Sequence, residues 1–206
     1  MTPLKKLSLT FSLVALSLTF VTPVCAQTAA QKSQPPPGWQ RYELDGDGDQ
    51  INVLLPAKPE DFGVAKLRRP SGEPLSTRVY MLSADAKIYF ALFVDLPKPT
   101  AEMSDRERGD LFYGIWNGLA AQTSRVLEEK FGTPFPITPS DQKVGPAPGG
   151  ERRMQDFKVG TESGRAQVVF FGQRAYMVVA IWNNKPGSEE DALRFLNSFQ
   201  IHRNQQ

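Results

Sequence analysis

Apolar and polar residues alternate in many short stretches of this chain, which is the pattern of half-buried β-strands. The alternating stretches are separated by short turns rich in Gly, Asp, Ser and Pro. The pattern therefore predicts a protein built mainly from strands. The expected strands lie at 39–44, 51–55, 64–68, 75–82, 87–96, 151–159, 165–171, 174–182 and 199–202.

Several of the later strands carry apolar residues on both faces. In the strand at 87–96, Phe90 lies on one face and Tyr89 on the other, and the hairpin at 165–182 shows the same mixture. Strands that are apolar on both faces need cover on both sides of the sheet. We therefore expect helices above and below it.

Two segments have the 3.6-residue spacing of amphipathic helices. The first begins at a capping box at 104–107, where a Ser hydroxyl and a Glu carboxylate can each bond a free backbone amide, and it ends near Lys130. The second is expected at 189–197 with Ser188 as its N-cap. The Pro- and Gly-rich segment 133–150 is expected to be a long loop with room for one short strand.

These elements predict an α+β fold, in which a mostly antiparallel β-sheet is sandwiched by helices in an α/β/α arrangement. A single domain is expected over 39–202. It follows a flexible linker at 27–38, which ends in three prolines and a glycine, a composition that builds no packed core.

The first 26 residues have the composition of a secretion signal. Lys5 and Lys6 supply a positive start and 7–21 is apolar, while Val24 and Ala26 are the small residues of a cleavage site after Ala26. The apolar run is about 15 residues long, whereas a membrane-spanning helix needs roughly 20. We therefore expect an exported protein, periplasmic or extracellular, without this segment.

Two other outcomes for this segment are open. It would act as a membrane anchor if it were retained, and it would be lipidated if Cys25 became the new N-terminus, although the residues before Cys25 match a lipidation motif poorly. Cleavage after Ala26 instead removes the only Cys of the chain. The mature protein is then expected to have no thiol chemistry and no disulfide.

Cleavage also changes the charge balance. The chain has 24 basic residues, of which Lys5 and Lys6 are removed, so 24 − 2 = 22 remain against 22 acidic residues. A near-neutral domain lacks the basic field that non-specific nucleic-acid binding requires. We therefore expect no nucleic-acid partner.

Three stretches resemble PsbP-like domains: Ile-Asn-Val-Leu-Leu-Pro-Ala-Lys-Pro-Glu at 51–60, Gly-Gln-Arg-Ala-Tyr at 172–176 and Arg-Phe-Leu-Asn-Ser-Phe-Gln-Ile at 194–201. The resemblance covers roughly 39–201. It implies an α/β/α sandwich that serves as an accessory or binding module without enzymatic chemistry. The family includes photosystem II extrinsic subunits and a Ran-binding nuclear transport factor, but no residue set for either role carries over to this chain.

Asp45, Asp47 and Asp49 have the spacing of the first three ligands, at positions 1, 3 and 5, of a calcium-binding EF-hand loop. The rest of the loop fails, because Gln50 stands where Gly is needed and Pro56 where Glu is needed. The alternative is a solvated turn between two strands, where Asp and Gly are common. A weak calcium site is kept as a hypothesis.

Other catalytic or cofactor chemistry finds little support. His202 is the only histidine, so a zinc site or a His-based triad lacks partners. Asp105, Glu107 and Asp110 suit an ordinary helix start, where acidic residues complement the helix dipole. We therefore expect no enzyme and no cofactor.

Lys66, Arg68 and Arg69, near Arg78, form a candidate basic surface for an anionic partner. The alternative is a charged strand edge that blocks aggregation. The sequence thus predicts a binding module for a protein partner, whose oligomeric state is left open. The second candidate function is binding of a small ligand in a pocket between helix and sheet, near 133–150.

The exported protein should begin at Gln27, because the signal is expected to be cut after Ala26. Intact-mass measurement of the secreted or periplasmic fraction checks this. Ala26→Arg puts a large charged side chain at the cleavage site and should leave the segment attached, while Ala30→Arg should not. A mature protein that keeps Met1 would contradict the prediction.

Overall fold

The computed structural model describes residues 35–46, 49–68, 74–131, 136–147 and 150–203. The predicted secretion signal, Cys25 and most of the predicted linker lie outside these residues. Among the helices of the described part, none is both long and apolar enough to cross a membrane.

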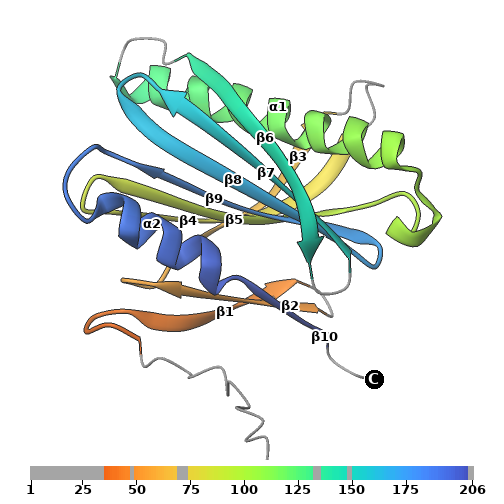
Figure 1. Cartoon of the computed structure of the whole chain (residues 1–206), viewed down its shortest axis with the longest axis horizontal. Coiled ribbons are helices and arrows are strands. Elements are labelled where there is room, and N and C mark those ends of the chain that lie inside the picture. The colour runs from red at the N-terminus through yellow and green to blue at the C-terminus, as the bar shows by residue number, and fades with distance from the viewer. Residues whose placement is uncertain (1–34, 47–48, 69–73, 132–135, 148–149, 204–206) are drawn as a thin grey trace, which may run out of the picture. The chain divides into compact units, whose positions relative to one another are not determined.

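A seven-stranded antiparallel sheet forms the centre of the fold (Figure 1). The strands at 60–68, 74–84 and 87–95 pair in sequence order, as do those at 137–147, 150–159, 162–171 and 174–182, and the pairing of 87–95 with 174–182 joins the two groups. The strands in spatial order are β3 (Glu60–Arg68), β4 (Pro74–Ala84), β5 (Lys87–Asp95), β9 (Arg174–Trp182), β8 (Glu162–Phe171), β7 (Gly150–Val159) and β6 (Ile137–Ala147).

A smaller antiparallel sheet contains β1 (Gln40–Gly46), β2 (Asp49–Leu55) and β10 (Gln200–Arg203), with β2 in the middle. The strand predicted near the C-terminus is therefore present, but its expected place in the main sheet is wrong. It pairs with β2, where Ile201 lies opposite Ile51. The alternation of apolar and polar residues predicts that a strand forms. Which strand it pairs with depends on the distant apolar residues with which it packs.

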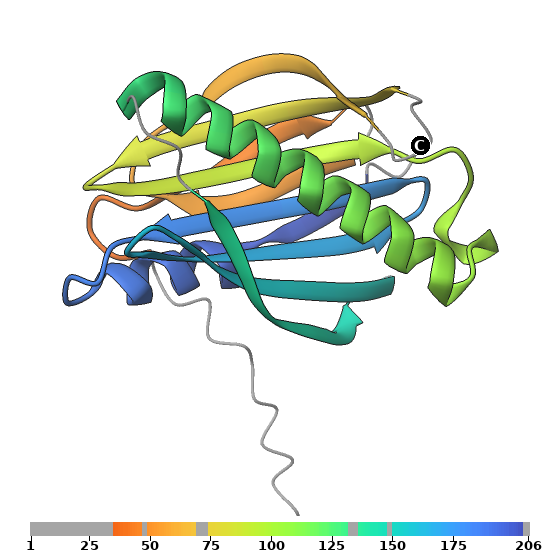
Figure 2. The ribbon, with the colours of Figure 1, turned by 90° about the horizontal axis from the view of Figure 1, so that it is seen from above.

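Different elements cover the two faces of the main sheet (Figure 2). Helix α1 (Asp105–Phe131) follows a short 3₁₀ turn and lies across one face, where Phe112 and Trp116 join the core with residues of β5, β7, β8 and β9. Helix α2 (Ser188–Ser198) and the smaller sheet cover the other face. The prediction of a mostly antiparallel α+β fold is confirmed. The second covering layer is a helix together with a sheet, instead of helices alone.

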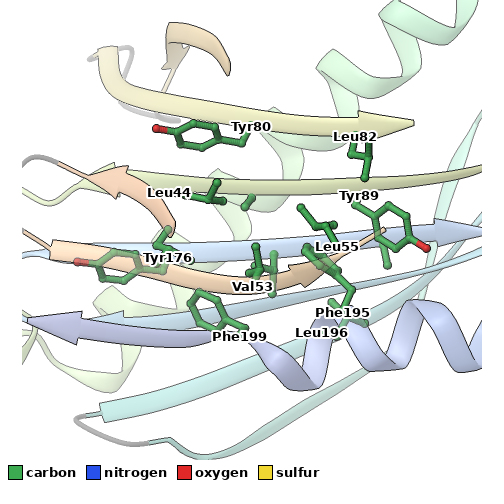
Figure 3. Close-up of a cluster of buried hydrophobic side chains, with 14 of the residues drawn as sticks. Leu44, Val53, Leu55, Tyr80, Leu82, Tyr89, Tyr176, Phe195, Leu196 and Phe199 are labelled. Atoms are coloured by element: carbon green, nitrogen blue, oxygen red, sulfur yellow. The ribbon is translucent and has the colours of Figure 1, made fainter. Parts of the chain in front are cut away.

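Figure 3 shows the core on the α2 side. Val53 of β2 and Phe195 of α2 belong to this core with Tyr89 of β5, and the Tyr89 and Phe195 rings meet edge to face at 5.1 Å between centroids. The backbone N–H of Leu54 donates to the Ser198 hydroxyl at 2.7 Å. These contacts fix α2 and β2 to each other as well as to the sheet.

The segment predicted as a long loop, 133–150, instead contains the 11-residue strand β6 at one edge of the sheet. Its Pro139 and Pro146 are tolerated because an edge strand needs backbone partners on one side only. A bulge between Pro139 and Gln142 lengthens the strand locally. The prediction allowed one short strand here and was wrong about its length, because proline and glycine exclude a central strand, but not an edge strand.

Helix α2 begins differently from the prediction. Gly187, with a left-handed φ of 79°, is the N-cap, and Ser188 is the first helical residue. The Ser188 hydroxyl donates to the Asn183 side-chain oxygen at 2.7 Å, and no side chain caps this end of the helix. The prediction that Ser188 is the cap was wrong because the helix begins one residue earlier, so Ser188 already lies inside the first turn.

The start of α1 is confirmed. The Glu107 carboxylate accepts the Ser104 backbone N–H at 2.8 Å, and the Glu107 backbone N–H donates to the Ser104 hydroxyl at 3.2 Å. Lys98 also donates to this carboxylate at 2.6 Å. The Lys98 ammonium first, and then the Ser104 amide and hydroxyl, lower the pKa of Glu107 to about 2.

Phe170→Asp should unfold the domain or cost at least about 4 kcal/mol, because it removes a ring that is 1% exposed and buries a charge. Urea unfolding followed by circular dichroism measures the loss. The control is Val144→Asp, at a position that is 58% exposed, which should change stability by about 0.5 kcal/mol or less. Equal unfolding midpoints for the two variants would contradict the sheet assignment.

Candidate functional site

The predicted basic residues fall on an edge of the main sheet. Strand β3 pairs with β4 on one side and has no neighbour on its other side among the strands of the described chain. Lys66 lies opposite Ser76 and Arg68 opposite Pro74 in this pairing, while Arg69 lies outside the described residues. An edge of this kind presents unpaired backbone donors and acceptors to other molecules. The structure thus places two of the three predicted residues on one edge strand.

A β-bulge interrupts this edge strand. Asp61 pairs with Tyr80 and Val64 with Arg78, so two residues of β3 face one residue of β4. Gly63 takes a left-handed φ of 71°, and its N–H donates to the Asp61 carboxylate at 2.8 Å. Glycine adopts this conformation without steric cost, which explains its place at the bulge.

Arg78 of β4 holds the bulge from the neighbouring strand. Its guanidinium donates to one Asp61 carboxylate oxygen from Nη2 at 2.5 Å and from Nε at 3.2 Å. These bonds, with the Gly63 amide, lower the pKa of Asp61. Exposed ion pairs contribute only about 0–1 kcal/mol. The main effect of the pair is therefore to fix the conformation of the bulge.

The bulge carries Phe62, whose side chain is 55% exposed. Tyr113 on α1 and Val144 on β6 are the other large apolar residues of the described chain with comparable exposure. Phe62 differs from both because it lies in a fixed bulge and on the strand that carries Lys66 and Arg68. Sequence analysis missed Phe62, although a Phe-Gly pair inside a strand pattern is a signal for a bulge.

A second group of charges lies where α1 meets β7. Glu151 accepts a hydrogen bond from Arg153 and lies 3.4 Å from Arg108 Nε. Arg108 also pairs with Asp105 and donates to the Met103 carbonyl at 2.6 Å. These charges serve one another within the fold, so the group attaches the start of α1 to the sheet.

Calcium binding at the turn that contains Asp45, Asp47 and Asp49 remains a hypothesis. Asp45 belongs to β1 and Asp49 to β2, whose pairing extends to Gly46 opposite Asp49, while Asp47 lies outside the described residues. Within the ranges that the structure covers, no three His, Cys, Asp or Glu residues are grouped to hold a metal. His202 is exposed on β10.

The predicted pocket between helix and sheet has no direct support. In the described part of that layer the space is occupied by apolar side chains, including Trp116 and Phe157, whose ring centroids are 4.8 Å apart. The β3 edge is therefore the better candidate for a binding site.

Comparison with known proteins gives little guidance on function. No protein-family model matches the chain, and no curated protein matches it. The chain is similar to the solution structure of cyanobacterial PsbP (CyanoP) from Synechocystis sp. PCC 6803, with a TM-score of 0.47 and 11% identity over 82% of this chain and 96% of that one. A similarity of this size supports no functional argument, so membership of the PsbP-like family stays a prediction.

Arg78→Gln should raise the pKa of Asp61 toward its ordinary value, because the guanidinium that donates to the carboxylate is lost. A carbon-13 NMR titration of the Asp61 carboxyl measures the shift. Since the folded pKa is lowered, the stabilisation is present above the ordinary pKa and is lost as the pH falls through the folded value. Arg41→Gln is the control, because Arg41 donates to Gln200. An unchanged midpoint in Arg78→Gln would mean that the ion pair does not form in solution.

Proposed function

We propose that this chain is an exported, non-enzymatic binding module that takes an extended segment of a protein partner at the β3 edge. The observation that carries the proposal is the exposed Phe62 in a fixed bulge of an edge strand that also bears Lys66 and Arg68. Edge strands commonly bind by strand addition, in which backbone bonds provide affinity and side chains provide selectivity.

The charges of β3 specify what the partner segment should contain. Lys66 and Arg68 lie toward one end of the strand, and Glu60 and Asp61 lie at the other. A partner strand should therefore carry acidic residues beside the basic end and avoid them beside the acidic end. Phe62 adds an aromatic side chain, and aromatic residues are enriched at protein interfaces.

Phe62 also bears on the alternative that the basic edge only prevents aggregation. An edge strand is protected from aggregation by charged side chains, prolines, β-bulges or inward-pointing charged residues. An aromatic side chain that is 55% exposed adds apolar surface to the edge and works against protection. The combination of cations with an exposed ring therefore favours selective binding.

The expectation that the module is not an enzyme is supported by how its carboxylates with lowered pKa values are used. Burial also raises the pKa of Glu162, which lies opposite Val159 at the start of β8. Glu107 and Asp61 both have lowered pKa values, and catalytic groups are often found by such shifts. Here Glu107 caps α1 and bonds Lys98, while Asp61 bonds Arg78 and Gly63. The expectation of export rests on the N-terminal segment of the sequence.

A photo-reactive phenylalanine analogue at position 62 should crosslink to a specific protein in the producing cells. The same analogue at Tyr113, which is 51% exposed on α1, is the matched control. The double change Lys66→Glu and Arg68→Glu should remove the adduct at position 62. The proposal is wrong if position 62 gives no adduct, or gives only those seen at position 113.

A further inference from the structure

The order of charges along β3 is complementary to that of a second, antiparallel copy of the same strand. The strand reads Glu-Asp-Phe-Gly-Val-Ala-Lys-Leu-Arg, acidic at its start and basic at its end. We propose that a second copy of this chain is a partner at this edge, with the two β3 strands antiparallel about a twofold axis. This inference rests on the proposed function, because it names the partner of the same site.

The pairing with β4 determines where the axis lies. Asp61 is opposite Tyr80 and Arg68 is opposite Pro74, so the two positions are 80 − 74 = 6 residues apart along β4. Their midpoint is Thr77, which faces Ala65. A twofold axis at Ala65 therefore brings the Asp61 position of each copy opposite the Arg68 position of the other.

The same axis matches the apolar positions. Phe62 lies in the bulge that faces Val79, which is two residues from Thr77 along β4. Leu67 faces Leu75, which is two residues from Thr77 in the other direction. Each exposed Phe62 thus falls beside the Leu67 position of the second copy. The pairing would remove from water a ring that is now 55% exposed.

Charge excludes two competing arrangements. Parallel, in-register pairing would place Lys66 beside Lys66 and Asp61 beside Asp61, and an antiparallel axis at Lys66 would again oppose two lysines. Like charges directly opposite one another destabilise a strand pair. An antiparallel axis at Val64 would oppose Asp61 to Lys66, but it would place Phe62 beside Ala65 instead of the larger Leu67. Charge and apolar matching together therefore favour the antiparallel register with its axis at Ala65.

The arrangement closes after two copies. A twofold contact uses the β3 edge of both molecules and leaves no second β3 edge for growth. The other edge of the sheet, β6, carries Pro139 and Pro146, and neither proline can donate a backbone hydrogen bond to an added strand. We therefore expect a reversible dimer and no larger assembly.

Charge exchange tests the register. Sedimentation velocity of the protein purified from the producing cells should show a dimer that increases with concentration. Arg68→Asp alone and Asp61→Arg alone should each be monomeric, and an equal mixture should dimerise again, because the two copies then restore opposite charges. Thermal unfolding of each variant checks that it is folded.

Disulfide trapping provides a second measurement that leaves the Asp61–Arg78 pair intact. Ala65→Cys lies on the axis, where directly opposite Cβ atoms are about 4.5–5.5 Å apart, close enough for a bridge after small shifts. It should form a covalent dimer on oxidation, whereas Lys143→Cys on the β6 edge should not.

The outcomes separate this inference from the proposed function. A wild-type protein that stays monomeric at its highest soluble concentration, with no crosslinked dimer of Ala65→Cys, overturns self-association. If position 62 still crosslinks to another protein, the proposed function stands with a different partner. If position 62 gives no adduct either, both fail.

Discussion

Burial on both faces of the central sheet is the constraint on which the rest of the structure depends. Every residue of β9 after Arg174 is buried, and β5 and β8 beside it are buried over most of their lengths. Removing each large apolar side chain from water contributes about 1.5–3 kcal/mol, which offsets the entropy of ordering the chain. Helix α1 covers one face of these strands, and α2 with the smaller sheet covers the other. The edge strands β3 and β6 are then where the backbone of the main sheet can meet another molecule.

The two edges are chemically different. Strand β6 carries Pro139 and Pro146, and proline cannot donate a backbone hydrogen bond to a neighbouring strand. Strand β3 contains no proline and combines charges of both signs with an exposed aromatic ring. The asymmetry explains why binding by strand addition is assigned to β3, although both strands end the same sheet.

The β3 edge is also a fixed surface. Gly63 supplies the left-handed backbone, Asp61 accepts the Gly63 amide, and Arg78 ties Asp61 to the neighbouring strand. A backbone segment held in this way loses less conformational freedom on binding, so more of the contact energy remains as affinity. The same bonds account for the lowered pKa of Asp61 without any catalytic role.

The sequence by itself determined the elements whose signals are local. Alternation located the strands, and the spacing of Ser104 and Glu107 located the start of α1, because each pattern depends on residues a few positions apart. The basic strand with Lys66 and Arg68 was also found in this way. Only the tertiary structure decided that β10 joins β2, that 133–150 contains an edge strand, and that Phe62 is exposed beside those cations. These features depend on which distant surfaces share a core, and no local pattern of side chains specifies that choice.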